Sequence, residues 1–317
     1  MKKNILMSVL LCLMIICVGC KNEAPPKEQD LTLDGALLNV TPPVLAPEMV
    51  KITPAADLKS DEGKETITDN ATPLKPGNVE INANAILGQY TTYFYNSAKA
   101  RKNNIVNAAK KINLKVVNPG EVFSTVDAIS PITKENGYED AGTYQDGRVV
   151  NAIGGGVCQV SSTLYNAVLG AELRVTERHP HSMTVSYVEL GRDAAIAGDY
   201  MDFCFQNTME TPIVIEAKVN PSGSILVRIR GVETRDKSNR KVSYESVILE
   251  TIEPGPAVIT YDKDQPKNYV KVTQSAHSGY QVELYRLIYY QGELTDRILL
   301  NKSTYEASPQ HLTIGVK

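Results

Sequence analysis

A run of three glycines leading into a cysteine constrains this chain more than any other feature. The segment IGGGVCQVSSTLYNAVLGAEL spans residues 153–173, and its apolar residues follow helical spacing over about 158–171. The predicted buried face of this helix is formed by Leu164, Ala167 and Val168. Glycines adopt positive φ readily and leave room for another backbone. The sequence therefore predicts a tight turn that places Cys158 in the first turn of a buried helix.

A thiol at the start of a helix has unusual electrostatic surroundings. Unpaired backbone N–H groups and the positive end of the helix dipole both stabilise the thiolate. We therefore expect the pKa of Cys158 to fall below the value of about 8.5 for a free thiol. Gly155, Gly156 and the side chain of Gln159 are candidate donors to an oxyanion or a substrate. Many cysteine hydrolases and acyltransferases share this order of glycine turn, nucleophile and helix.

A cysteine nucleophile needs a base and a group that orients the base. Of the four histidines in the chain, His179 and His181 precede MTVSYVEL, an alternating segment over 183–190 that predicts a strand. If this stretch is extended, both imidazoles face the same side, and either can be the base. Asp193 is the preferred carboxylate to orient it, with Asp199 and Asp202 as alternatives.

Two neighbouring polar residues are candidate binding groups, and every candidate also has a purely structural interpretation. Ser182 can add a hydrogen bond, and Arg192 can bind a carboxylate or phosphate, although such arginines often pair with nearby glutamates. Cys158 can be a small core residue or can form a disulfide with Cys204. The glycines can serve packing alone, and the histidines can bridge local turns. A Cys/His metal site lacks the usual ligand spacing, so no metal and no cofactor is predicted.

The N-terminus has the features of an export signal. Lys2 and Lys3 precede an apolar stretch over 5–18 that is short for a membrane span. The small residues before Cys20 resemble the lipobox of bacterial lipoproteins. That resemblance implies a signal peptide over 1–19 and lipidation of Cys20, which would anchor the protein to the extracytoplasmic face of the membrane. A plain secretory signal is the alternative.

Composition divides the rest of the chain into three parts. Residues 20–78 are rich in proline without sustained periodicity, which predicts a disordered linker. A first folded domain is expected over 79–222. Residues 240–317 read as alternating strands with glycine-containing turns, including a hairpin with Gln291 and Gly292 at its bend. The second folded part is therefore expected to be all-β.

Several motifs together resemble one known family. They are PGEVFS, GGGVCQVSSTLYNAV, ERHPHS, VSYVELGRDAAI and DFCFQN, and they resemble the VanW-like family over about residues 85–220. The expected fold is an α+β domain whose nucleophile-type helix packs on a mixed or antiparallel sheet. The family is named after vancomycin-resistance gene clusters, and its members are exported proteins of mostly Gram-positive bacteria. The resemblance thus implies a cell-wall setting.

The tail resembles a G5 domain, a small β module proposed to bind N-acetylglucosamine, which implies peptidoglycan or another wall glycan as a partner. The net charge of −3 gives no reason to expect nucleic acid as a partner. Two functions remain open. One is a Cys-His-Asp hydrolase or transpeptidase-type acyltransferase acting on peptidoglycan peptides. The other is a non-catalytic lipoprotein that binds or assembles wall polymer. A redox thiol is less favoured because Cys158 has no cysteine nearby in sequence.

Overall fold

A computed structural model describes residues 83–317 of the 317-residue chain, except 146–147 and 221. The expected signal peptide over 1–19, the lipidation residue Cys20 and the expected linker over 20–78 lie outside the described residues. None of the helices in the described part is long and apolar enough to cross a bilayer.

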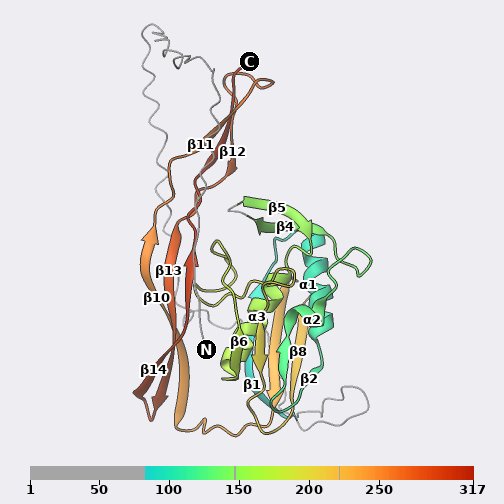
Figure 1. Ribbon diagram of the computed structural model, residues 1–317, viewed down its shortest axis with the longest axis vertical. Coiled ribbons are helices and arrows are strands. Elements are labelled where there is room, and N and C mark those ends of the chain that lie inside the picture. Colours follow the sequence, from blue (N-terminus) through green and yellow to red (C-terminus); the bar gives the residue numbers. More distant parts are fainter. Residues whose placement is uncertain (1–82, 146–147, 221) are drawn as a thin grey trace, which may run out of the picture. The chain divides into compact units, whose positions relative to one another are not determined.

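The first domain is built on a four-stranded antiparallel sheet (Figure 1). Its strand order is β1 (Ala85–Tyr93), β9 (Ser224–Gly231), β8 (Ile213–Asn220) and β2 (Lys115–Val117). The side chains of β9 alternate between buried and half-buried, as expected for a strand with one face on the core. Because β9 pairs with both β1 and β8, the domain continues to Gly231, past the boundary at 222 expected from sequence.

Helices cover one face of this sheet. Helix α3 (Val157–Gly170) packs against β1 and β9, and α1 (Lys99–Ile112) packs beside it and against β8. The short helix α2 (Thr125–Ile129) contacts α1. Nearly every residue of α3 is buried, including the expected face of Leu164, Ala167 and Val168. The expected packing of this helix on an antiparallel sheet is confirmed.

Two smaller sheets complete the domain. One has the order β3 (Val122–Ser124), β7 (Cys204–Gln206), β6 (Arg174–Glu177), and the other is the pair β4 (Asp140–Gln145) and β5 (Arg148–Ile153). The prediction of a strand over 183–190 is wrong, because these residues form no regular secondary structure. Met183 and Tyr187 alternate with polar residues, yet they pack within a loop, Met183 in the core and Tyr187 against His181. Alternation here reflects loop packing and not a β ladder.

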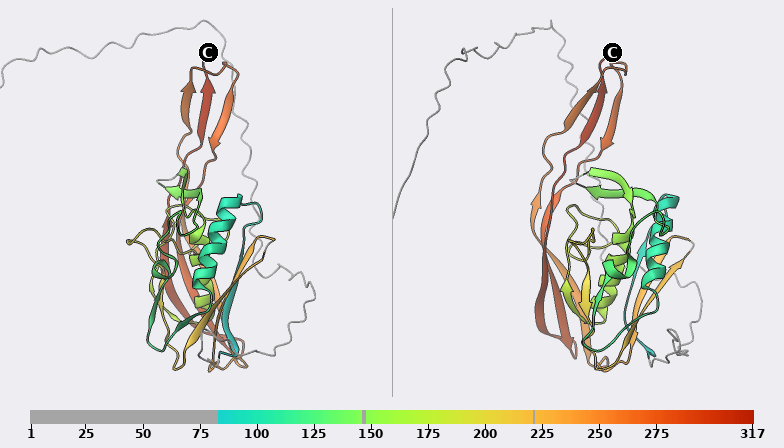
Figure 2. Two further views of the ribbon diagram at one scale, coloured as in Figure 1. Left: turned by 90° about the vertical axis from the view of Figure 1, so that its right-hand side faces the viewer. Right: turned by 45° about the vertical axis from the view of Figure 1, so that its right-hand side comes forward.

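The C-terminal residues form strands only, as expected (Figure 2). One sheet has the order β10 (Arg240–Ile252), β13 (Gly279–Tyr290), β14 (Glu293–Tyr305), and the other has the order β11 (Val258–Asp262), β15 (His311–Gly315), β12 (Val270–Gln274). The expected hairpin at the bend between β13 and β14 is confirmed. Gln291 and Gly292 both have positive φ, 52° and 92°, which suits a two-residue turn.

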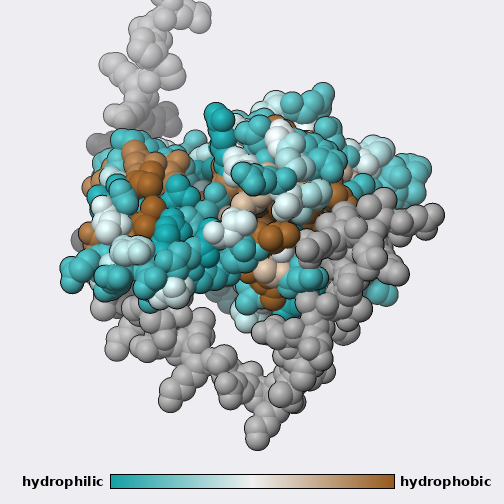
Figure 3. Space-filling view, turned by 90° about the horizontal axis from the view of Figure 1, so that it is seen from below, coloured by the Kyte–Doolittle hydropathy of each residue, from teal (hydrophilic) through white to brown (hydrophobic). Residues whose placement is uncertain are grey.

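Ion pairs and apolar contacts join these strands to the first domain, and both belong to one compact unit. The guanidinium of Arg240 donates to both oxygens of Glu172 at 2.7 Å, and Arg235 adds a third contact at 3.3 Å. Burial raises the pKa of Glu172, but the arginines more than offset this and the pKa is lowered. Exposed apolar side chains gather on the outer strands, including Ile248 and Leu249 of β10. Figure 3, which views the molecule from below relative to Figure 1, shows brown apolar patches among teal polar groups.

Candidate active site around Cys158

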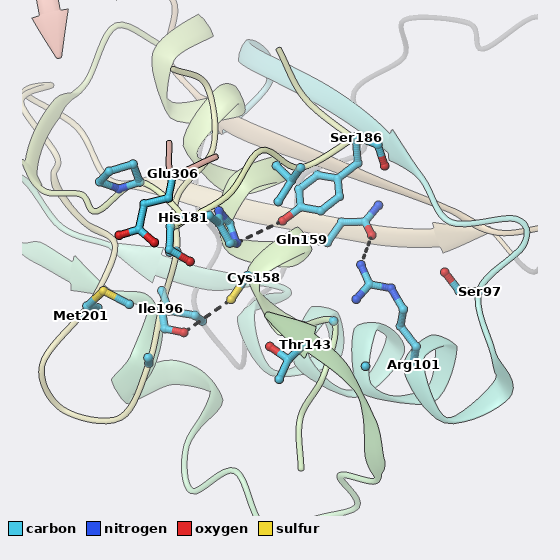
Figure 4. Close-up of a pocket in the computed structure, with 18 of the residues that line it drawn as sticks. Ser97, Arg101, Thr143, Cys158, Gln159, His181, Ser186, Ile196, Met201 and Glu306 are labelled. Atoms are coloured by element: carbon cyan, nitrogen blue, oxygen red, sulfur yellow. Dashed lines mark hydrogen bonds between the residues drawn. The ribbon is translucent and has the colours of Figure 1, made fainter. Parts of the chain in front are cut away.

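A cavity of about 760 Å³ opens above the first turn of α3 (Figure 4). Its lining comes from both folded parts of the chain. The lining includes Arg101 of α1, Gly156, Cys158 and Gln159 at the start of α3, His181, Ser182 and Tyr187 of the following loop, and Glu306 after β14. Figure 4 shows the sulfur of Cys158 between His181 on one side and Arg101 on the other. The cavity therefore places a thiol, an imidazole and charges of both signs around one space.

The glycine run sets the direction in which α3 begins. Gly156, the residue before the helix, has a φ of 112°, a conformation that side chains other than glycine rarely adopt. Gly155 is packed against β4, where a Cβ would lie 2.4 Å from the carbonyl oxygen of Ala141. Gly156 lines the cavity and Gly155 does not. Of the two glycines predicted to bind substrate, only Gly156 thus lies at the cavity.

Polar side chains of α3 hold the segment that carries Asp193. The Ser161 hydroxyl donates to the carbonyl of Ala194 at 2.6 Å, and the Ser162 hydroxyl accepts from the N–H of Ala194 at 2.9 Å. The Asn166 side chain donates to the carbonyl of Arg192 at 2.7 Å. Buried hydroxyls and amides need such partners, and here the partners are backbone groups on both sides of Asp193. The helix that presents the thiol therefore also fixes the carboxylate.

Cys158, His181 and Asp193 come together in the fold. The Nδ1 of His181 lies 2.7 Å from Oδ2 of Asp193, and the backbone N–H of His181 donates to the same oxygen at 2.7 Å. His181 also interacts with the thiol of Cys158, whose sulfur lies 3.4 Å from the carbonyl oxygen of Ile196. The order thiol, imidazole, carboxylate is the arrangement of a nucleophilic triad.

The charges of this group depend on one another. Burial raises the pKa of Asp193, but the hydrogen bond from His181 and the charge of Arg178 lower it to about 2. Burial lowers the pKa of His181, but its bonds to Asp193 and Cys158 raise it to about 9. Burial raises the pKa of Cys158, and His181 and the charge of Arg101 more than offset this, so the pKa is lowered. The lowered pKa of Cys158 and the raised pKa of His181 both shift the pair toward a thiolate beside an imidazolium.

Comparison with known proteins identifies the family of the domain that carries this site. Residues 100–230, which include all three triad residues, match the family model described as VanW like protein. The chain contains a VanW-like domain. The uncharacterized protein YoaR of Bacillus subtilis (strain 168) is 41% identical over 156 residues, which are 49% of this chain and 51% of that protein. The vancomycin B-type resistance protein VanW of Enterococcus faecalis (strain ATCC 700802 / V583) is 30% identical over 110 residues, or 33% of this chain and 40% of that protein.

The chain thus spans about half or less of the length of these curated relatives. The chain is also similar to solved G5 domains. The G5 domain of an IgA1 protease is 23% identical, with a TM-score of 0.18, over 26% of this chain and 96% of that structure.

The other acid and base candidates of the VanW-like domain lie elsewhere. His179 is half-buried, and its Nε2 lies 3.0 Å from Oε1 of Glu177. Asp199 is exposed, and Asp202 accepts from the N–H of Val126 at 2.9 Å. The expectation that His179 and His181 share one side assumed an extended chain. In the structure the two imidazoles have different partners, Glu177 for His179 and Asp193 for His181.

The remaining binding candidates are divided between the cavity and the domain's interior. Ser182 lines the cavity. Gln159 is 1% exposed, and its side chain already donates to Thr92 and to the carbonyl of Tyr93 while accepting from Arg101. Arg192 lies outside the cavity, where it donates to Asn166 at 2.7 Å. The side chains of Gln159 and Arg192 already form hydrogen bonds within the protein, whereas a substrate donor was expected to have free N–H groups.

Three further residues surround the triad. Arg178 donates to Oδ1 of Asp193 at 2.7 Å, and its side chain is 5% exposed. Tyr305 donates to the same oxygen at 2.6 Å. The hydroxyl of Tyr187 lies 3.4 Å from Nε2 of His181. A signal existed for Tyr187, which lies in an apolar stretch close to His181, but no local pattern points to Tyr305.

The second cysteine of the folded part has different surroundings. Cys158 and Cys204 are both free thiols. Burial and the neighbouring carboxylates of Asp202 and Glu177 raise the pKa of Cys204 to about 12, so it stays protonated at neutral pH. Within residues 83–317, apart from 146–147 and 221, no cluster of three or more His, Cys, Asp or Glu residues is arranged to hold a metal ion.

Replacing His181 by alanine is expected to raise the pKa of Cys158, because burial then acts without its main opposing interaction. Each unit of increase slows alkylation tenfold at a pH below the pKa, so we expect iodoacetamide to react at least about tenfold more slowly at pH 7. The rate is measured on the Cys158 peptide by mass spectrometry. His179→Ala is the matched control and is expected to leave the rate unchanged. Equal rates in wild type and His181→Ala would contradict this electrostatic account.

Proposed function

We propose that the VanW-like domain is a cysteine-dependent acyl-transfer enzyme that acts on peptide bonds of peptidoglycan. The observation that carries this proposal is the 2.7 Å bond between His181 and Asp193 beside Cys158, at the edge of an open cavity. These are the nucleophile, base and orienting group that acyl transfer requires. In the same picture, the lipid on Cys20 anchors the protein at the extracytoplasmic membrane face, and the G5-like strands bind wall glycan.

The reaction has two halves that balance in atoms and protons. The Cys158 thiolate attacks the amide carbonyl carbon, the C–S bond forms, and the carbonyl oxygen becomes an oxyanion. The C–N bond then breaks, and the imidazolium of His181 gives its proton to the leaving amine. The resulting thioester is attacked by water or by an acceptor amine, whose proton passes to His181 as the C–S bond breaks. Water gives hydrolysis, and an amine gives transpeptidation.

The backbone N–H of Cys158 is the best-placed donor for the oxyanion. At the second position of α3 it has no acceptor within the helix, and it makes no hydrogen bond with any described residue. The neighbouring N–H groups of Val157 and Gln159 are already bonded to Gly154 and Gly156. An N–H that belongs to the nucleophile itself lies close to the carbonyl under attack, so it supports an oxyanion role.

The charged residues of the cavity support a peptide substrate that carries both a carboxylate and an ammonium group. Arg101 on one side and Glu306 on the other line the cavity, and neither forms an ion pair with a described residue (Figure 4). Peptidoglycan stem peptides carry free carboxylates and often a free amine. A guanidinium can bind such a carboxylate through two hydrogen bonds, while Glu306 can receive an ammonium.

The test is incubation of the wild-type protein with purified muropeptides, followed by mass spectrometry of both products and protein. We expect shortened or newly cross-linked peptides and, on rapid acid quenching, a peptide-sized mass addition on Cys158. Binding of muropeptides without product or adduct would overturn the enzyme proposal. That result would favour the non-catalytic wall-binding lipoprotein.

A further inference from the structure

The end of strand β14 reaches the site from outside the VanW-like domain. Asn301, Ser303 and Tyr305 occupy alternate positions of this strand, so their side chains share one face. Ser303 and Tyr305 are 3% and 1% exposed, in a strand whose first half is exposed throughout. This face is buried because it packs on the segments that carry His181 and Asp193.

Both oxygens of Asp193 are held by directed hydrogen bonds, and β14 supplies one of them. The Tyr305 hydroxyl donates to Oδ1 at 2.6 Å and accepts from the N–H of Gly191 at 2.7 Å. Arg178 donates to the same Oδ1 at 2.7 Å. Oδ2 is left for the backbone N–H and the Nδ1 of His181. The Tyr305 hydroxyl therefore fixes the rotation of the carboxylate that orients the imidazole.

Two more contacts from the same strand hold the surrounding groups. The Ser303 hydroxyl accepts from Arg178 at 2.7 Å, on the guanidinium nitrogen that does not bind Asp193. The backbone N–H of Glu306 donates to the carbonyl of Ser182 at 2.6 Å, directly after His181 in the chain. The strand thus supports the carboxylate, its arginine partner and the backbone beside the imidazole.

We propose that Tyr305 is a positioning residue for the acyl-transfer site and that the C-terminal strands are needed to complete that site. Tyr305 lies beyond residue 230, where the VanW match ends. The inference rests on the proposed function, because it assigns Tyr305 a role through Asp193 and His181. The C-terminal module then has a second task besides any binding of wall polymer. A VanW-like domain without these strands has an Asp193 that lacks one of its two Oδ1 donors.

The test is the pH dependence of Cys158 alkylation in the full chain, compared between wild type and Tyr305→Phe. Phenylalanine keeps the buried ring and removes only the hydroxyl. Asp193 then holds His181 less firmly, so the imidazolium form of His181 is less stable. The Cys158 thiolate is in turn less stabilised by the positive charge of that imidazolium. The groups that set this titration are His181, Arg101, Tyr187 and Asp193. We expect the midpoint to move to higher pH and the rate at pH 6.5 to fall about three- to tenfold.

Tyr285→Phe is the matched control. Tyr285 lies in the same sheet, but its hydroxyl bonds Glu283 at the surface, so we expect an unchanged profile. Alkylation is followed on the Cys158 peptide by mass spectrometry, which separates it from the other cysteines, and circular dichroism verifies folding. Where Tyr305→Phe does not fold, Ser303→Ala tests the same strand through Arg178.

The outcomes separate this inference from the proposed function. A wild-type midpoint at or above about 8.5, the value of a free thiol, contradicts the proposed function itself. A low wild-type midpoint that is unchanged in folded Tyr305→Phe or Ser303→Ala overturns only the positioning role. A purely structural role for Tyr305 lowers the melting temperature without moving the midpoint, and this result also overturns the inference.

Discussion

Replacing Cys158 by alanine is expected to abolish muropeptide turnover, with a loss of at least about 10³-fold in rate. The variant has no atom that can form the thioester, and His181 is left without a group to activate. The measurement is product formation followed by mass spectrometry over hours, at a pH near 7. The mass addition on the protein is expected to disappear together with the products.

Two comparisons make this result specific. Cys204→Ala removes the other free thiol of the folded part, whose pKa is raised to about 12, and is expected to keep full turnover. Cys158→Ala is expected to keep its binding of muropeptides, because Arg101 and Glu306 still line the cavity. Turnover by Cys158→Ala within tenfold of wild type would mean that the chemistry, if any, uses another residue.

The core of the site was predictable because its signals are local. The positions of the glycines and of Cys158 relative to a helical apolar pattern are properties of one short segment, and α3 begins and ends within a residue or so of expectation. His181 and Asp193 were named from residue type and proximity in the chain. The choice of His181 over His179 depends on the contacts that Asp193 makes with the backbone and the imidazole of His181, which no periodicity encodes.

The rest of the site depends on contacts between distant parts of the chain. Tyr305 and Asp193 are 112 positions apart, and their contact depends on how β14 packs on the loop after His181. Arg178 follows the exposed Glu177 in the chain, but its own charge is buried against Asp193. No strand forms over 183–190. The segment around Asp193 is held instead by hydrogen bonds from side chains of α3, such as those of Ser161 and Ser162 to the backbone of Ala194.

Replacing Asp193 by alanine is expected to destabilise the protein by about 3–5 kcal/mol. The substitution leaves the guanidinium of Arg178, which is 5% exposed, and the buried imidazole of His181 without their shared negative partner. It also removes the acceptor of the Tyr305 hydroxyl. The measurement is the free energy of unfolding from urea titration of the full chain. Asp199→Ala, at an exposed carboxylate, is the matched control and is expected to stay within about 0.5 kcal/mol of wild type.

The difference in the free energy of unfolding between wild type and Asp193→Ala should depend on pH. This dependence distinguishes a stabilising effect of the Asp193 charge from an effect of its packing. The pKa of Asp193 is lowered from 3.8 to about 2, so its stabilising contribution is present above pH 3.8 and is lost as pH falls through about 2. The pKa of His181 is raised from 6.5 to about 9, so its contribution is present below pH 6.5 and is lost as pH rises through about 9. The gap between wild type and Asp193→Ala should therefore be widest between about pH 4 and 6.5 and should narrow on both sides. A gap that is constant from pH 3 to pH 9 would show that Asp193 stabilises the fold by filling space and not by its charge.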